Sequence, residues 1–281
     1  MEKYCDLHTH SVFSDGTCTP AEIISLAEDA GLSAVALCDH NTVAGLPDFQ
    51  AAARTSTVEA VAGIELSTEY LNKDLHIVGL YIRPEFYGDI SARMEDYSRR
   101  KTESNMDLCE GLCRHGYPIT YEEICARFPG GNVNRAHFAA LLTEKGFASS
   151  VRDAFDSILG EEIGIYHPPK RFEVLESIAY LKSLGAVPIL AHPFLDLKED
   201  ELEVFLPVAK EAGLAGMETI YSTFDAAERA LASRIAEKHG LLPSGGSDFH
   251  GENKPDICIG RGRGDLFVPF SYLEDIRKKL Q

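Results

Sequence analysis

Short apolar runs alternate with amphipathic segments along the first part of the chain. The first run ends in residues 6–10 (DLHTH), and apolar positions at helical spacing then predict a helix over 20–30, with Thr19 as its N-cap and Pro20 at its first position. Further apolar runs predict strands at 31–40, 58–67 and 75–82. This alternation is typical of an α/β fold with a largely parallel sheet.

The pattern changes after about Arg83, where the chain becomes polar up to about Pro169. Helical periodicity in this region is found at 93–116, 120–128 and 135–146. The alternation then resumes, with helices expected at 172–185, 199–212 and 226–239 and strands at 186–193, 214–220 and 241–250. The sequence therefore predicts a discontinuous α/β domain made of residues 1–83 and 171–281, interrupted by a helical insertion over 84–170.

Composition and charge limit the possible partners. The 281 residues include 27 Lys and Arg against 44 Asp and Glu, a net charge of −17, which argues against broad electrostatic binding to duplex DNA or to anionic membranes. The N-terminal residues lack the features of a signal peptide and no stretch has transmembrane length, so we expect a cytoplasmic protein. The seven cysteines contain no CxxC pair and are expected to be reduced thiols.

Metal-binding residue types gather in or just after the predicted strands. Six of the ten histidines do so, namely His8, His10, His40, His76, His192 and His250, and they are joined by Asp15, Glu65 and Asp248. In a strand, His8 and His10 point to the same face, and parallel strands place their carboxyl ends at one edge of a sheet. A single histidine of this kind could equally be a structural residue bonded to a backbone carbonyl. Nine such residues together predict a metal centre.

The nature of these nine side chains indicates the chemistry. Nitrogen and oxygen donors without a thiolate suit Mn²⁺, Fe²⁺ or Zn²⁺, held in more than one site, and Glu65 is a natural bridge between two ions. A multinuclear centre activates water to hydroxide at neutral pH and holds phosphoryl oxygens during in-line displacement. The residues therefore predict hydrolysis of a phosphate ester.

Six segments resemble, in order and spacing, the motifs of the polymerase and histidinol phosphatase (PHP) superfamily of metal-dependent phosphoesterases. They are DLHTHSVFSDG, CDHNTVAG, GIELS, HIVGLY, AHP and SGGSDFHG. The resemblance implies a distorted (β/α)₇ barrel with three divalent metal ions. It groups the ligands as His8, His10, Glu65 and Asp248 for one ion, Glu65, His76 and His192 for a second, and Asp15, His40 and His250 for the third. Cys38 stands where many relatives have Thr, with little expected effect.

The insertion resembles the helical subdomain of the PHP group that includes nucleoside 3′,5′-bisphosphate phosphatases, whose members can also trim short 5′-phosphorylated RNA. Residues 132–160 and 166–170 carry this likeness. Arg135 and His137, at an expected helix start, are candidates to bind a substrate phosphate. The alternative is that Arg135 forms a surface pair and His137 packs inside the subdomain. Lys170 is either a third phosphate contact or a solvated surface lysine.

These features lead to one expected function and two alternatives. We expect a phosphatase that removes the 3′-phosphate of nucleoside 3′,5′-bisphosphates, with exonuclease action on short RNA, in which Arg135 and His137 bind the 5′-phosphate. His192 or Asp248 would assist proton transfer as well as bind metal. One alternative is a histidinol-phosphate phosphatase or another small phosphomonoesterase. The other is a non-catalytic metal-binding accessory module, which the apparently complete ligand set argues against.

Overall fold

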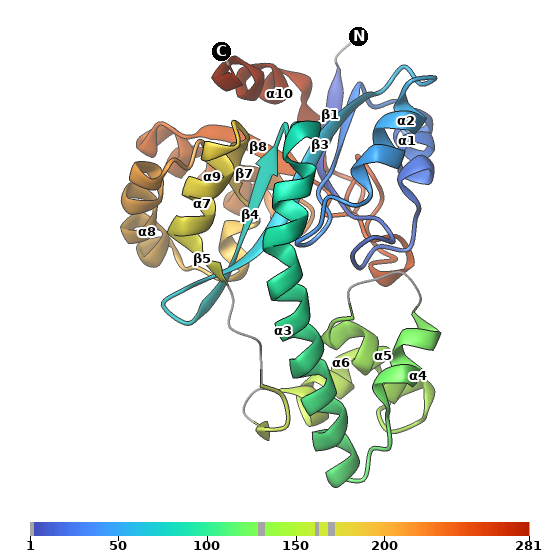
Figure 1. The fold of residues 1–281 in the computed structure, drawn as a ribbon. Coiled ribbons are helices and arrows are strands. Elements are labelled where there is room, and N and C mark those ends of the chain that lie inside the picture. Colours follow the sequence, from blue (N-terminus) through green and yellow to red (C-terminus); the bar gives the residue numbers. More distant parts are fainter. Residues whose placement is uncertain (1–2, 129–132, 161–162, 168–171, 281) are drawn as a thin grey trace. The chain divides into compact units, whose positions relative to one another are not determined.

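The computed structural model describes residues 3–128, 133–160, 163–167 and 172–280 (Figure 1). The chain forms two compact units. We call Met1–Ser91 with Arg171–Gln281 the barrel unit and Ala92–Lys170 the helical unit. The division lies inside the long helix α3 (Tyr87–Arg114) rather than at Arg83. That the two units are separate domains stays a prediction.

Nine strands of the described chain form one sheet in the order β8-β7-β6-β4-β3-β2-β1-β9, with β5 paired to β3. They are β1 (Tyr4–Thr9), β2 (Ala34–Leu37), β3 (Glu59–Tyr70), β4 (Lys73–Leu80), β5 (Phe172–Glu173), β6 (Val187–Leu190), β7 (Gly216–Tyr221), β8 (Leu242–Gly246) and β9 (Val268–Pro269). Every strand predicted from the sequence is present, and each boundary lies within a few residues of its prediction.

The sheet nearly closes on itself where β8 meets β1. The backbone N–H of Asp248 donates to the carbonyl of His8, and that of His10 donates to the carbonyl of Phe249, both at 2.9 Å. Gly246 makes this approach possible, because a Cβ at its position would lie 2.4 Å from the Cβ of His8. The chain therefore forms the expected distorted α/β barrel.

Strand direction differs from expectation at β4. Strands β1, β2 and β3 are parallel, as are β6, β7 and β8, but β4 runs antiparallel to both β3 and β6. The two-residue turn Leu71–Asn72 joins β3 to β4, with φ of 49° and 64°, whereas a parallel connection needs a long crossover. Leu71 gives no glycine signal for such a turn. Glu65 consequently lies in the middle of β3, not at its end, and His76 lies within β4.

Helices cover the barrel strands (Figure 1). Those of the barrel unit are α1 (Pro20–Asp29), α2 (Leu46–Ala53), α7 (Val174–Ser183), α8 (Glu199–Ala212), α9 (Ala226–His239) and α10 (Phe270–Arg277), with short turns η1 (Pro84–Phe86), η4 (Pro193–Leu195), η5 (Gly251–Asn253) and η6 (Lys278–Leu280). Thr19 caps α1 and forms a capping box with Glu22, as its position predicted. Leu7, Val78 and Ile189 are among the buried core residues.

The helical unit has its own apolar core. Its elements are the main part of α3, α4 (Tyr121–Arg127), α5 (Arg135–Glu144), α6 (Val151–Ala154) and the π-helical turn η2 (Phe155–Leu159). Leu108, Leu112, Ile124, Phe138 and Leu142 are fully buried in it. The three helices predicted here are confirmed, although α3 begins at Tyr87, earlier than the expected residue 93.

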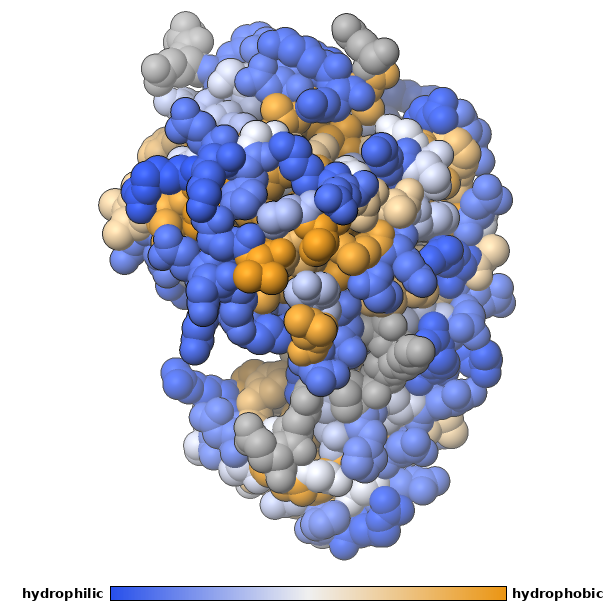
Figure 2. Space-filling view, turned by 90° about the vertical axis from the view of Figure 1, so that its left-hand side faces the viewer, coloured by the Kyte–Doolittle hydropathy of each residue, from blue (hydrophilic) through white to orange (hydrophobic). Residues whose placement is uncertain are grey.

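The face shown in Figure 2 is mostly hydrophilic, with apolar side chains in small groups. No helix in the described part of the chain combines the length and apolarity needed to span a membrane. All seven cysteines are free thiols, as expected.

Candidate metal centre

One oxygen of the Glu65 carboxylate faces three imidazoles. Glu65 is fully buried in β3. Its Oε2 atom lies 3.3 Å from Nε2 of His8, 3.3 Å from Nε2 of His10 and 3.0 Å from Nδ1 of His40. These histidines come from β1, from the residue after β1 and from the loop after β2, so the parallel strand ends bring them together.

The other oxygen of Glu65 faces two more histidines. Oε1 lies 2.9 Å from Nδ1 of His76 and 3.1 Å from Nε2 of His192. His76 reaches this point from β4 because the antiparallel hairpin sets it directly opposite Ser67, two residues beyond Glu65 on β3. A single carboxylate is therefore surrounded by five imidazole nitrogens, the arrangement expected of a bridging ligand.

Asp15, Asp248 and His250 extend the cluster on the His10 side. Oδ1 of Asp248 lies 3.2 Å from Nε2 of His10 and 3.4 Å from Nδ1 of His250. Nε2 of His250 lies 3.2 Å from Oδ1 of Asp15. The structure thus brings all nine sequence-predicted ligands into one connected cluster.

Three groups within the cluster have ligand atoms close enough to share an ion. They are His10, Asp15, His40 and His250; His8, His10 and Glu65; and His40, Glu65 and His76. Compared with the grouping that the family resemblance implied, His10 and His40 each belong to two groups. The family resemblance assigned His10 and His40 to one ion each, whereas the distances in the structure allow each of them to share an ion with either of two groups.

The buried atoms of this cluster fit divalent metal ions. Nε2 of His8, Nε2 of His10, Nδ1 of His40 and Oε2 of Glu65 are buried and make no hydrogen bond within the described part of the chain. Buried polar atoms are rarely left unsatisfied, because each one costs the free energy of its lost hydration. Several such nitrogens converging on one carboxylate form a suitable donor set for metals of the Mn, Fe or Zn type.

A second carboxylate, Glu218, orients the ligands, a role that was not expected from the sequence. Glu218 is buried in β7, where Oε1 lies 2.9 Å from Nδ1 of His8 and Oε2 accepts the backbone N–H of His192 at 2.6 Å. Histidines that bind metal commonly donate their second N–H to a carboxylate, which sets the ring orientation. The signal in the sequence was an acidic residue inside the apolar run 214–220.

Asp39 holds the loop that carries Asp15. Its buried carboxylate accepts three hydrogen bonds of 2.7 Å, from the backbone N–H and hydroxyl of Ser11 and from the hydroxyl of Ser14. Asp39 therefore positions the loop after β1, a role that its place next to His40 did not reveal.

Burial and close charges shift the pKa values in the cluster. Burial opposes ionisation of Glu65, but the charges of His40, His8 and His76 outweigh it and hold its pKa well below its usual range. Burial lowers the pKa of His40 to about 3, which favours the neutral imidazole that a metal requires. For His10, the nearby carboxylates of Asp248 and Glu65 outweigh burial, and its pKa rises to about 9. Protons and metal ions therefore compete for the His10 ring.

The backbone is strained at the ends of three strands that carry the cluster. Asn41, His192 and Asp248 have φ of 52°, 28° and 55°, in a region that residues other than glycine rarely adopt. Strain of this kind persists where surrounding structure holds it, and it gathers at functional sites.

A cavity of about 240 Å³ opens beside the cluster within the barrel unit. Five predicted ligands line it, and so do Leu195, Tyr221 and Lys254. The Tyr221 hydroxyl donates to Oδ2 of Asp248 at 2.7 Å, and the Lys254 ammonium donates to the same oxygen at 2.6 Å. Neither residue was expected from the sequence, although Lys254 follows the predicted ligand His250 closely in the chain.

Comparison with known proteins places the chain in a family. The model of the PHP domain matches residues 6–109. A 5′-3′ exoribonuclease of Haemophilus influenzae is 30% identical over 251 residues, which cover 89% of this chain and 91% of that protein. The chain belongs to the PHP family. A 3′,5′-nucleoside bisphosphate phosphatase of Chromobacterium violaceum is 27% identical over 90% of each chain.

A solved structure supports the same conclusion for this PHP protein. A Bifidobacterium adolescentis protein, described as a metal-dependent phosphoesterase, superposes with a TM-score of 0.85 at 26% identity, covering 99% of this chain and 96% of that one. With the ligand cluster in the barrel, these relationships make the chain a metal-dependent phosphoester hydrolase.

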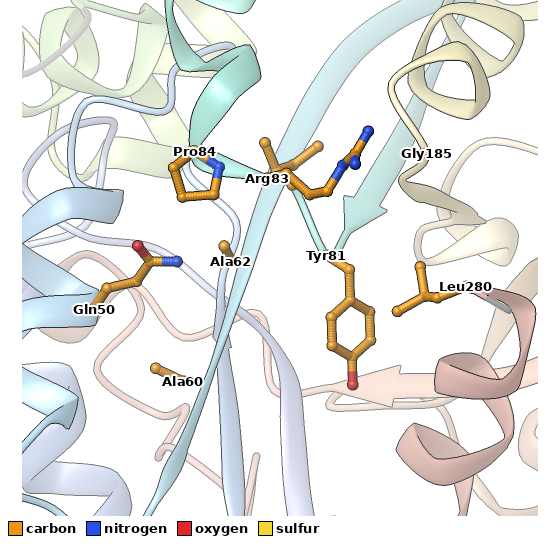
Figure 3. Close-up of a pocket in the computed structure, with 9 residues that line it drawn as sticks. Gln50, Ala60, Ala62, Tyr81, Arg83, Pro84, Gly185 and Leu280 are labelled. Carbon is orange, nitrogen blue, oxygen red and sulfur yellow. The ribbon is translucent and has the colours of Figure 1, made fainter.

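A larger cavity of the PHP protein, about 450 Å³, carries none of this chemistry (Figure 3). Gln50, Tyr81, Arg83 and Leu280 are among its lining residues. The described residues around it include no carboxylate, imidazole or thiol. Tyr81 follows β4 directly whereas His76 is the fourth of the eight residues of β4, so this cavity lies toward the C-terminal end of that strand, away from His76.

The helical unit contains the predicted phosphate-binding residues. Helix α5 starts at Arg135, with Asn134 as its N-cap. His137 is buried, its Nδ1 atom accepts the backbone N–H of Asn134 at 3.1 Å, and its ring stacks on Phe128 with centroids 4.6 Å apart. One ring nitrogen of His137 is thus used in a hydrogen bond to the N-cap residue of α5. Its role toward substrate stays a prediction.

Arg135 lies against aromatic rings of the same unit. Its guanidinium carbon is 4.6 Å from the centre of the Tyr166 ring and 5.9 Å from that of Phe155. Such contacts hold the plane of a guanidinium in one orientation. Lys170 lies outside the described residues.

Proposed function

We propose that this PHP phosphoesterase removes the 3′-phosphate of nucleoside 3′,5′-bisphosphates. The observation that carries the proposal is the nine-residue cluster around Glu65, beside a cavity of about 240 Å³. The substrate class is supported by the bisphosphate phosphatase of C. violaceum, whose sequence aligns with 90% of this chain. We further propose that the cluster holds three divalent ions of the Mn²⁺, Fe²⁺ or Zn²⁺ type.

The residues of the cluster have distinct roles in this proposal. Bound divalent ions supply an activated water and neutralise charge on the phosphoryl oxygens. Glu65 bridges ligand groups, and Glu218 holds the His8 ring so that Nε2 faces Glu65. His192 and Asp248 both line the cavity, so they are our candidates for moving a proton to the departing 3′-oxygen.

Short 5′-phosphorylated RNA is the second proposed substrate. In a nucleoside bisphosphate and at the 5′ end of such an RNA, the bond to be broken joins the 3′-oxygen of a 5′-phosphorylated nucleotide to phosphorus. The leaving group is then the same 5′-nucleotide in both reactions. The exoribonuclease of H. influenzae, which resembles 89% of the chain, supports this extension. A net charge of −17 favours short over long RNA.

The test is phosphate release from adenosine 3′,5′-bisphosphate by protein reconstituted with Mn²⁺, with AMP and histidinol phosphate as parallel substrates. We expect rapid release from the bisphosphate, AMP as the product, and slow release from the other two compounds. Chelation of the metal should abolish the activity. Preferential turnover of histidinol phosphate would contradict the proposed substrate and favour the alternative phosphomonoesterase.

A further inference from the structure

The two carboxylate oxygens of Asp248 serve different neighbours. Oδ1 faces the metal-type residues, at 3.2 Å from Nε2 of His10 and 3.8 Å from Nε2 of His8. Oδ2 accepts hydrogen bonds from the hydroxyl of Tyr221 and the ammonium of Lys254. Asp248 therefore links the predicted ligands to one neutral donor and one cationic donor.

The two donors differ in their access to the cavity. The Tyr221 residue is only 4% exposed, whereas the side chain of Lys254 is 38% exposed. An ammonium group has three N–H donors, and the hydrogen bond to Asp248 occupies one of them. Lys254 can thus donate to a molecule in the cavity without leaving Asp248.

The charge of the cavity lining gives this lysine its importance. Glu65, Asp74, Asp196 and Asp248 line the cavity, and Lys254 is the one lysine or arginine among the described residues around it. A phosphate group entering the cavity meets carboxylates on several sides. Apart from bound metal, the lining offers it a single ammonium.

We propose that Nζ of Lys254 binds a non-bridging oxygen of the phosphoryl group under attack while it stays hydrogen-bonded to Asp248. Lys254 forms no covalent bond in the reaction. It donates a charge-assisted hydrogen bond to an oxygen that gains negative charge as the bond to the leaving oxygen breaks. Tyr221 has a different role and positions Asp248 only. In this inference, the identity of the nucleotide rests on the proposed function. The contact between Lys254 and the phosphate does not depend on it.

Two matched variants separate phosphate binding from the positioning of Asp248. Lys254→Met and Tyr221→Phe each remove one hydrogen bond to Oδ2 of Asp248, but only Lys254→Met removes a charge from the cavity. Both proteins are loaded with Mn²⁺, their metal affinity is measured by calorimetry, and inorganic phosphate is used as the probe ligand. Circular dichroism checks that each variant is folded.

We expect Lys254→Met to weaken inorganic phosphate binding about tenfold or more, as loss of a charge-assisted hydrogen bond implies, and Tyr221→Phe to weaken it less than about threefold. Metal affinity should fall by similar factors in both variants. Lys254→Arg should recover part of the phosphate affinity. Equal losses of phosphate affinity in Lys254→Met and Tyr221→Phe would overturn the inference, because they would show that Lys254 acts only through Asp248.

The outcome is independent of the nucleotide substrate. If the wild-type protein fails to hydrolyse adenosine 3′,5′-bisphosphate while Lys254→Met still loses phosphate affinity, the proposed substrate is wrong and the role of Lys254 stands. If the wild-type protein hydrolyses the bisphosphate and Lys254→Met keeps wild-type phosphate affinity and kcat/KM, the proposed function stands and the role of Lys254 is wrong.

Discussion

Nδ1 of His8 lies 2.9 Å from Oε1 of Glu218, although the two residues are 210 positions apart in the chain. The contact crosses from β1 to β7 and turns Nε2 of His8 toward Glu65. The second oxygen of Glu218 accepts the backbone N–H of His192, a residue with a φ of 28°. One buried carboxylate thus holds two of the predicted metal ligands in place.

The first prediction concerns Glu218. The substitution Glu218→Gln should lower metal affinity about 10- to 100-fold, because the His8 ring loses its carboxylate partner, while the fold persists. Calorimetric titration with Mn²⁺ measures the change. Glu203→Gln is the matched control, since Glu203 accepts hydrogen bonds from Lys238 and His239 on the outside of the barrel unit. Equal metal affinity in Glu218→Gln and wild type would show that Glu218 does not support the site.

The second prediction concerns protons. The pKa of His10 rises to about 9 and that of His76 to about 10, because nearby carboxylates outweigh the burial that would lower them. Both rings therefore carry a proton near neutral pH until a metal displaces it. The metal-bound form holds fewer protons, so metal affinity should increase as pH rises from neutrality toward these pKa values.

Calorimetry in two buffers of different ionisation enthalpy checks this proton release. The apparent enthalpy of Mn²⁺ binding near neutral pH should differ between the two buffers. The direction of the difference should be the one expected when the buffer takes up protons that the protein releases on binding. An identical enthalpy in both buffers would mean that no proton leaves on binding, contrary to the expected competition.

The third prediction concerns Arg135. If Arg135 binds the 5′-phosphate, Arg135→Ala should raise KM for adenosine 3′,5′-bisphosphate about tenfold or more, since hydrogen bonds to charged groups contribute about 1.5–3 kcal/mol. KM for adenosine 3′-phosphate, which lacks the 5′-phosphate, should change little. Arg152→Ala is the control, because the side chain of Arg152 is 92% exposed in the same unit. Reduced thermal stability with an unchanged KM would instead assign Arg135 to packing against Tyr166.

The fourth prediction concerns the closure of the barrel. Gly246→Ala should destabilise the protein by about 1–3 kcal/mol, because the added Cβ would lie 2.4 Å from the Cβ of His8 and 2.6 Å from its backbone nitrogen. The shift of His8 should also weaken metal binding. Urea unfolding at fixed metal concentration gives the free energy change.

Gly88→Ala provides the comparison for that experiment. Gly88 lies in the first turn of α3, and apart from its chain neighbours and the backbone of its own helix no atom comes within 4 Å of a Cβ built there. Alanine should stabilise this helix by up to about 1 kcal/mol. Destabilisation of similar size in both variants would show that the close approach of Gly246 to His8 is not the cause of the loss of stability.

Local sequence was sufficient to predict much of the fold. Helices α8 and α9 have the boundaries that periodicity predicted, and Thr19 caps α1 as expected. Capping and helical periodicity depend on residues three or four positions apart, so the sequence contains them directly. The direction of β4 was not accessible in this way, because the turn uses Leu71 at a positive φ that leucine rarely adopts.

The sequence by itself determined which nine side chains could form a metal centre, because each follows or lies in an apolar run that had to become a barrel strand. Only the tertiary structure decided which carboxylates and donors support them. Glu218 contacts His8, and Tyr221 contacts Asp248. In each pair the two residues come from different strands or strand ends of the barrel. The energy of such a contact depends on the distance between atoms after the barrel has closed, and a pattern of neighbouring residues does not encode that distance.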